Sequence, residues 1–398
     1  MTQANDIVAV AGVRTPIGSF GGSLRDVAVY DLGAQVIRAT TERAGIDAAL
    51  IDKVVYACCR QAGNGPNPAR TAAVRGGMPI TTPVFTVNMA CPSGMKSMFL
   101  AARELQAGDA RFVMAGGMES MSSMPYLLRN ARWEGFKSGD KVLQDSWSDT
   151  VDPLCGYGMG ITAENQSEKY GITRTQQDEF ALRSQQLAAA AQKAGVFADE
   201  IVPVKLEASK QHPEGKLLSA DEGGRPDTTL DKLAKLKPVF KKDGTVTAGN
   251  ACTMGDAAVA ILLTTRETAK AHGLKPLFSV LSFAETAVEP SLMGDGPGMG
   301  IPLALQRAGL TLQDIDFIEV NEAFAAQMLA NERALGWNRD KVNVFGGAIA
   351  IGHPTGFSGA RLPLTLSTIL RQHNKELGVA AICGGGGVTV AMVIRRES

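Results

Sequence analysis

Short continuous apolar runs alternate along the chain with segments whose apolar residues recur at helical spacing. The apolar runs, rich in β-branched residues, predict buried strands at residues 7–12, 54–57, 83–87 and 112–117. The helical spacing predicts helices over residues 27–44, 69–76 and 95–105. Strands that alternate with helices of this size are typical of crossover connections around a mostly parallel sheet, so we expect an α/β fold.

The pattern changes between residues 118 and 249, where tryptophans, prolines and charge clusters replace the buried-strand runs. Thr173 and Gln176 have the spacing of a capping box, and the alanine-rich helix that they open should end near Gly195. We interpret this stretch as an inserted domain. The alternation resumes afterwards with apolar runs at 257–263 and 277–284.

Two parts of the chain repeat one arrangement. Ser93-Gly94 and Ser358-Gly359 each follow a strand and a turn, and each opens an apolar helix that leads to a strand ending in glycines. Two copies of one βαβ unit indicate a duplicated fold, with ligands bound where strand carboxyl ends and helix N-termini meet. The predicted units are an N-terminal half, an inserted loop domain and a C-terminal half, at residues 1–120 with 249–272, 121–248 and 273–398.

Composition and charge exclude several classes of function. Forty basic residues balance forty acidic ones among 398 residues, so no global field draws nucleic acid or an anionic membrane to the chain. Residues 1–6 lack the basic and apolar pattern of a signal peptide, and no apolar run is long enough to span a bilayer. We therefore expect a soluble, cytoplasmic protein that binds neither nucleic acid nor a membrane.

The six cysteines are scattered and include no CxxC pair, which argues against a disulfide framework and a zinc site. Cys91 lies between a strand end and a helix N-terminus, where backbone N–H groups and the helix dipole favour the thiolate. The related turns of the second half supply His353, inside the glycine-rich stretch 343–361, and Cys383. We predict a nucleophilic thiol with a neighbouring base, and an oxyanion hole at the glycines 384–386.

Over its whole length the sequence resembles the thiolases, and the motifs follow one another in the family's order. Residues 87–94 resemble the nucleophile motif around Cys91, and residues 346–354 the histidine motif around His353. The other matching motifs are at residues 116–122, 159–165, 245–250, 293–294, 321–325 and 383–386. The resemblance implies a layered α-β-α-β-α core built from two related halves, with an inserted loop domain.

The resemblance also implies thiolysis of a 3-oxoacyl-CoA by coenzyme A, or the reverse Claisen condensation. Cys91 would be acylated, His353 would be its general base, and Cys383 would exchange a proton with the α-carbon of acetyl-CoA. One oxyanion site would use His353 and a water held by Asn321, and the other the N–H groups of Cys91 and Gly385. Acyl-CoA and CoA are the expected partners, and the chemistry requires no metal and no redox cofactor.

Further residues are assigned by the same resemblance. Arg225 would contact the nucleotide end of coenzyme A, and Met159, Met293 and Phe324 would line the acyl end. Nearby positive charge indicates either a solvated face or a pocket edge for phosphates, and its lysines are Lys232, Lys235, Lys237, Lys241 and Lys242. The resemblance to thiolases also suggests that the protein assembles as a homodimer or a homotetramer.

The chain departs from the usual thiolase pattern at Pro92, Gly158, Cys252, Thr355, Phe357 and Gly384. Proline at a first helical position leaves the N–H of Cys91 untouched. Gly158 in place of a histidine would enlarge the pocket or loosen the contact to the thioester, and Cys252 would hold the pantetheine arm more weakly than serine. Because these changes surround the expected acyl pocket, we predict an acyl group other than acetoacetyl, with branched, aromatic and carboxylated groups as alternatives.

Two other functions compete with a thiolase. A decarboxylating ketoacyl synthase shares this fold but has histidine where this chain has Cys383, which argues against it. A catalytically poor, CoA-binding or scaffold subunit of a heteromeric acyl-CoA complex would account for the altered positions that face coenzyme A. Acylation of Cys91 distinguishes an enzyme from such a subunit.

Overall fold

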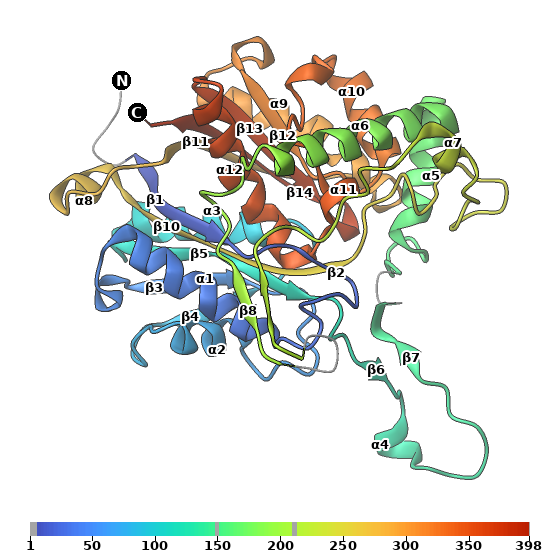
Figure 1. Cartoon of the computed structure of the whole chain (residues 1–398), viewed down its shortest axis with the longest axis horizontal. Coiled ribbons are helices and arrows are strands. Elements are labelled where there is room, and N and C mark those ends of the chain that lie inside the picture. Colours follow the sequence, from blue (N-terminus) through green and yellow to red (C-terminus); the bar gives the residue numbers. More distant parts are fainter. Residues whose placement is uncertain (1–5, 148–150, 209–212, 398) are drawn as a thin grey trace.

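The computed structural model describes residues 6–147, 151–208 and 213–397 (Figure 1). Residues 1–5, on which the expectation about a signal peptide rests, lie outside these ranges. Within them, no helix is both long enough and apolar enough to cross a membrane. A ten-stranded sheet organises the chain, and its strands are β1 (Ile7–Arg14), β2 (Gly18–Ser19), β3 (Lys53–Ala57), β4 (Val84–Val87), β5 (Phe112–Ser120), β10 (Gly255–Thr265), β11 (Phe278–Ala287), β12 (Phe317–Val320), β13 (Leu377–Cys383) and β14 (Val388–Arg396).

The sheet is mixed, so the expectation of a mostly parallel sheet is wrong. The strand order is β12-β13-β14-β11-β1-β10-β5-β3-β4, with β2 paired to β10. Strands joined through crossover helices are parallel, namely β3 with β4 and with β5, and β12 with β13. The pairs formed by β10 and β14 are antiparallel. The strand β14 follows β13 after a short glycine turn, and such a connection permits only antiparallel pairing.

Helices cover and separate the two halves of this sheet. Figure 1 shows the C-terminal half, in orange and red, beside the N-terminal half in blue, with α3 and α12 between them. The core helices are α1 (Val29–Ala44) and α2 (Pro68–Arg75) outside the first half, α3 (Ser93–Ala107) and α12 (Thr355–Gln372) in the middle, and α9 (Gly296–Ala308) and α10 (Ala325–Leu335) outside the second half. These layers confirm the predicted α-β-α-β-α core.

Alternation along the strands distributes apolar side chains between the layers. Val113 of β5 packs toward the central helices, whereas Met114 packs toward α1 and α2. In the second half, Ile382 of β13 packs toward the central helices and Ala381 toward α9 and α10. Because successive strand residues point to opposite faces, each half of the sheet is buried on both sides.

The two halves repeat one topology, as the sequence predicts. The strands β1, β10, β5 and β3 of the first half correspond to β11, β14, β13 and β12 of the second. The counterpart of β4 is reduced to a single parallel bridge between Ile318 and Val342. The central helices meet at their matching glycines, since a Cβ on Gly94 would lie 2.7 Å from the Ala360 nitrogen, and one on Gly359 would lie 2.6 Å from the Met95 nitrogen.

The segment between β5 and β10 carries two long helices, α5 (Met159–Tyr170) and α6 (Arg174–Lys193), where the sequence predicts one. The predicted capping box opens α6, because Thr173 and Gln176 exchange both hydrogen bonds. Gly195 follows that helix with a φ of +68°. An arm with β6 (Tyr126–Leu127), α4 (Ala131–Glu134) and β7 (Gln144–Asp145) extends away from the core in Figure 1. The remaining elements include β8 (Val204–Leu206), β9 (Lys216–Leu218), α7 (Leu230–Ala234), α8 (Arg266–Ala271) and α11 (Ala348–Ile351).

Candidate active site

A cavity of about 580 Å³ lies where strand ends and helix N-termini of both halves meet the inserted segment. Eight of the residues predicted from the sequence line it: Cys91, Gly158, Met159, Cys252, Met293, Phe324, His353 and Gly385. Cys383 and Asn321 lie outside this lining and are 1% and 0% exposed. Arg225 lines a second cavity of about 600 Å³. The two cavities share a wall that includes Cys252 and Phe240, so a long ligand can occupy both.

Cys91 sits in a tight turn immediately before α3. Ala90 has a φ of +53°, and the Ser93 hydroxyl fixes the turn by donating to the Ala90 carbonyl at 2.5 Å and accepting the Met89 N–H at 2.7 Å. Burial raises the pKa of Cys91 above 9.0, although the Arg60 charge and the Gly385 N–H each lower it. The expected preference for the thiolate is therefore wrong, because the effect of burial outweighs that of the nearby charge and N–H groups. The thiol needs a base.

His353 provides a base in a defined tautomer. Its Nδ1 lies 2.7 Å from the Ser358 hydroxyl, and that hydroxyl donates its own proton to the Pro354 carbonyl at 2.8 Å. Nδ1 must therefore carry the proton in this bond, which leaves the lone pair on Nε2. Nε2 is buried and has no hydrogen-bond partner among the described residues. Burial, together with the Arg361 charge, lowers the pKa of His353 to about 4, so the ring is neutral at neutral pH.

Three thiols, Cys91, Cys252 and Cys383, lie near one another at this site. Cys383 ends β13, and burial followed by the nearby Cys91 raises its pKa well above 9.0. The same two causes raise the pKa of Cys252 to about 12. Cys383 is therefore a protonated thiol near neutral pH, which suits a group that donates a proton.

Asn321 follows β12 and is completely buried. Its backbone N–H donates to the Ala381 carbonyl at 3.0 Å, but neither polar atom of its side chain has a partner among the described residues. A buried amide without a protein partner fits an ordered water. This observation is consistent with the predicted role of Asn321 in holding a water.

The glycine turn after Cys383 faces the start of α3. The Gly386 N–H donates to the Asp152 carboxylate at 2.6 Å, and both Gly386 and Gly387 have positive φ. A Cβ on Gly384 would lie 2.4 Å from the Cδ atom of Pro92. Two departures from the thiolase pattern are thus one feature, because the proline ring fills the space that a side chain at residue 384 would need.

Most of the other residues predicted to face the substrate line the cavity, but one of them does not. Met159 and Met293 line the cavity, and Phe324 packs edge-on against Phe240 with ring centroids 6.1 Å apart. Thr355 also lines the cavity. Phe357, in contrast, is 0% exposed in the core between the half-sheets, so the placement of Phe357 at the acyl pocket is wrong.

The second cavity is lined by the cations Arg225 and Lys232 and by the acids Glu222 and Asp227. The Arg225 N–H donates to the Gln185 side chain at 2.7 Å, which fixes the backbone of this loop. Of the five clustered lysines, Lys232 alone belongs to the lining within the described residues, and Lys241 pairs with Glu168. Of the predicted cations, this cavity edge offers Arg225 and Lys232, and Lys232 is paired with Asp227 of the same lining.

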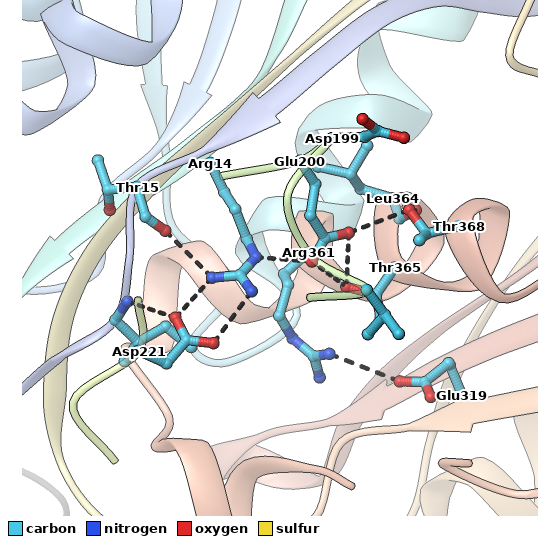
Figure 2. A network of polar contacts seen from close by, with 12 residues as sticks. Arg14, Thr15, Asp199, Glu200, Asp221, Glu319, Arg361, Leu364, Thr365 and Thr368 are labelled. Carbon is cyan, nitrogen blue, oxygen red and sulfur yellow. Dashed lines mark hydrogen bonds and ion pairs between the residues drawn. The ribbon is translucent and has the colours of Figure 1, made fainter. Parts of the chain in front are cut away.

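A buried ion network ties the loop of Arg225 to the core (Figure 2). Arg14 of β1 donates to both oxygens of Asp221, at 2.7 and 3.0 Å, and to Glu200 at 2.8 Å. Glu200 also accepts from Thr365 and Thr368 of α12. These bonds connect the inserted segment with β1 and with the helix that follows His353.

The same loop reaches the helix that precedes His353. A Cβ on Gly223, two residues after Asp221, would lie 2.8 Å from the carbonyl oxygens of Ala350 and Ile351 in α11. The loop that carries Arg225 and the turn that carries His353 are therefore held by one set of contacts. These contacts fix the position of the loop of Arg225 relative to the turn of His353.

Glu119 is a positioning residue whose role is evident only from the fold. It ends β5 fully buried and accepts the N–H groups of Cys59 at 3.1 Å and Gly356 at 2.9 Å, and the Thr355 hydroxyl at 2.5 Å. It thereby connects the loop after β3 to the turn of His353. The one feature of the sequence that points to Glu119 is its position inside the motif at residues 116–122.

The family models for the thiolase N-terminal domain and the thiolase C-terminal domain match residues 7–267 and 274–396. The chain belongs to the thiolase family, which confirms the resemblance, and it is an enzyme of the acyltransferase class.

Its relatives cover nearly its whole length. It is 50% identical over 394 residues to a probable acetyl-CoA acyltransferase of Staphylococcus epidermidis, with 98% of each chain covered. It is similar to the crystal structure of the Bacillus anthracis acetyl-CoA acetyltransferase, with a TM-score of 0.95, 40% identity and 100% of each chain covered. It is also similar to human mitochondrial 3-ketoacyl-CoA thiolase in complex with CoA, with a TM-score of 0.94, 38% identity and 100% of each chain covered.

Proposed function

We propose that this enzyme cleaves 3-oxoacyl-CoA esters with coenzyme A, or runs the reverse Claisen condensation, through an acyl group on Cys91. One observation carries the proposal: His353, whose Nε2 has no partner among the described residues, and the Cys91 thiol line one cavity, and Cys383 lies close to Cys91. The relative that is solved in complex with CoA supports coenzyme A as the ligand.

Acylation is the first half of the proposed reaction. Nε2 of His353 takes the proton of the Cys91 thiol, and the sulfur attacks the 3-carbonyl carbon of the substrate. The bond between C2 and C3 breaks, and its electron pair becomes the enolate of acetyl-CoA. The Cys383 thiol protonates C2, so that acetyl-CoA leaves and the acyl group remains on Cys91 as a thioester.

Transfer to coenzyme A completes the proposed cycle. The Cys383 thiolate takes the proton of the CoA thiol, and the CoA sulfur attacks the acyl carbonyl. The Cys91 sulfur leaves and regains its proton from the His353 imidazolium. Every group is restored, and the chemistry calls for no metal or redox cofactor beyond the CoA thioesters themselves.

Two oxyanions form along this path, and the site offers a donor set for each. The N–H groups of Cys91 and Gly385 both act on the Cys91 sulfur, so they lie where an oxygen bonded to the same reacting carbon can accept from them. The thioester enolate would be stabilised by His353 and by a water on the side chain of Asn321. Preorganised donors of this kind contribute several kcal/mol in a water-excluded site, about 3 kcal/mol for a single donor.

The cavity also favours an acyl group larger than acetoacetyl. Gly158 adds no side chain to the wall, and Met159, Met293 and Phe324 make that wall apolar. Assembly as a homodimer or homotetramer, a cytoplasmic location and a place in fatty acid or acyl-CoA metabolism belong to the same proposal and are supported by the family resemblance.

The test is intact-protein mass spectrometry after incubation with a panel of 3-oxoacyl-CoA esters, without free CoA. We expect a mass increase equal to the acyl group, absent in Cys91→Ala and unchanged in Cys155→Ala, because Cys155 lies outside the cavity lining. Release of acyl-CoA when CoA is added completes the assay. An enzyme that forms no adduct and consumes no 3-oxoacyl-CoA would instead fit the scaffold alternative.

A further inference from the structure

An arginine lines the wall of the reaction cavity. Arg60 follows β3 and lines the cavity of Cys91, but it does not belong to the lining of the cavity of Arg225. Its guanidinium lies over the Trp147 ring, 5.6 Å from the centroid. Among the described residues the guanidinium forms no ion pair and donates no hydrogen bond, and its Nε atom is buried without a partner. Arg60 as a whole is half-buried, and a guanidinium nitrogen that is removed from water is usually paired with an acceptor.

The two acids near Arg60 among the described residues, Asp152 and Glu119, already accept other hydrogen bonds. Asp152, which lines the same cavity, accepts the N–H groups of Leu154 at 2.9 Å and Gly386 at 2.6 Å. Glu119 accepts the backbone N–H of Arg60 at 2.9 Å, together with the bonds described above, and forms no bond with the guanidinium. The cavity therefore holds a guanidinium that the described residues leave without a hydrogen-bond acceptor, in a wall that is otherwise largely apolar.

We propose that Arg60 binds a carboxylate at the far end of the acyl chain, so that the preferred substrate is the mono-CoA thioester of a 3-oxodicarboxylic acid. This inference rests on the proposed function and narrows the three alternatives of the sequence analysis to one. A guanidinium offers a planar fork of donors that matches a carboxylate, and exclusion of water strengthens the pair. Thiolysis of such a substrate would give acetyl-CoA and a shorter dicarboxylic mono-CoA ester.

Two other roles for Arg60 make different predictions. If the arginine served the nucleophile alone, by lowering the pKa of Cys91, its loss would slow neutral and carboxylated substrates equally. If the arginine held a phosphate of coenzyme A, its loss would weaken the binding of free CoA as well. The phosphate role is disfavoured because the cations of the nucleotide end, Arg225 and Lys232, line the other cavity.

The experiment compares two substrates of equal carbon number, the CoA thioesters of 3-oxohexanedioic acid and of 3-oxohexanoic acid. The ratio of their kcat/KM values for thiolysis is measured in the wild type, Arg60→Leu and Arg60→Lys. We expect the ratio to favour the dicarboxylic ester, to fall about 30-fold or more in Arg60→Leu and to fall less in Arg60→Lys. The matched control is Arg103→Leu, which removes an arginine stacked 5.1 Å from the Phe99 ring and outside both cavities.

A ratio of kcat/KM values that is unchanged in Arg60→Leu, whether both esters lose activity equally or neither does, overturns the proposal. A second measurement does not depend on turnover: calorimetric binding of hexanedioyl-CoA and hexanoyl-CoA to Cys91→Ala, with and without Arg60→Leu. A carboxylate preference that disappears with Arg60, in a protein that cleaves neither 3-oxoacyl ester, would uphold this inference and reject the proposed function. Equal binding of the two esters would reject the inference alone.

Discussion

Replacing Ser358 by alanine removes the hydroxyl that accepts the Nδ1 proton of His353. The imidazole is then free to carry its proton on Nε2, the atom that must accept the proton of Cys91. Ser358 is buried and does not line the cavity, so it acts on the substrate only through His353. We expect Ser358→Ala to slow acylation of Cys91 and to leave substrate affinity unchanged.

The size of the effect follows from the hydrogen bond that is lost. A buried N–H left without an acceptor costs about 1–3 kcal/mol, and the lower half of this range, about 1–2 kcal/mol, corresponds to roughly a 5- to 30-fold loss of rate. The loss should appear in kcat for acylation, with KM nearly constant. Ser358→Thr keeps a hydroxyl and should recover most of the rate.

The assay is single-turnover acylation of Cys91, followed by rapid quenching and mass spectrometry. Thr365→Val is the matched control, since it removes another buried hydroxyl from α12 whose bond goes to Glu200 and not to His353. A Ser358→Ala enzyme that is acylated at the wild-type rate would refute the assignment of the tautomer. An equal loss in Thr365→Val would assign the effect to the stability of the helix.

Three further predictions concern the frame of the site. Arg14→Met should destabilise the fold by about 3–5 kcal/mol in urea unfolding, because Asp221 and Glu200 would be left buried without their cation; a change below 1 kcal/mol would contradict this. Gly384→Ala should reduce activity because its Cβ would clash with Pro92. Adding Pro92→Gly to that variant should restore the activity, whereas Pro92→Gly by itself should not raise the activity of the wild type. The pKa of His353 is about 4 in the fold and near 6.5 when unfolded, so the unfolded chain binds a proton first as the pH falls. The free energy of unfolding should therefore be highest above pH 6.5 and should decrease as the pH falls toward 4. The loss is up to about 3 kcal/mol, and it should be absent in His353→Gln when unfolding is followed across that range.

Local signals in the sequence predict most of the elements. The helix α1 ends at Gly45 and α3 at Gly108, both with left-handed φ, because glycine satisfies the helix end without strain. The repeat of Ser-Gly at the starts of α3 and α12 also predicts which turns meet. Alternation alone did not predict strand direction, since direction depends on how the connections run outside the strands. The helix α5 was missed because its buried positions include Thr162, Glu164 and Gln166, whose side chains do not mark an apolar face.

The residues that carry the chemistry were easier to predict than their protonation states. Cys91, His353 and Cys383 stand at related turns of two halves, and the fold brings related turns together. The pKa of Cys91, however, depends on burial by segments far away in the chain, including the loop after β13. Arg60 and Glu119 were overlooked for the same reason, since their significance lies in what the fold places around them.

The pair of Pro92 and Gly384 shows why departures from a family pattern should be interpreted together. Taken singly, Pro92 suggested a tolerated change beside the nucleophile, and Gly384 suggested a change in the acyl pocket. Their atoms compete for one space, 2.4 Å apart if residue 384 had a Cβ, so each substitution accounts for the other and neither requires a new substrate. Evidence for an unusual acyl group must come from residues without such a partner. Arg60, whose guanidinium has no acidic partner among the described residues, meets that condition.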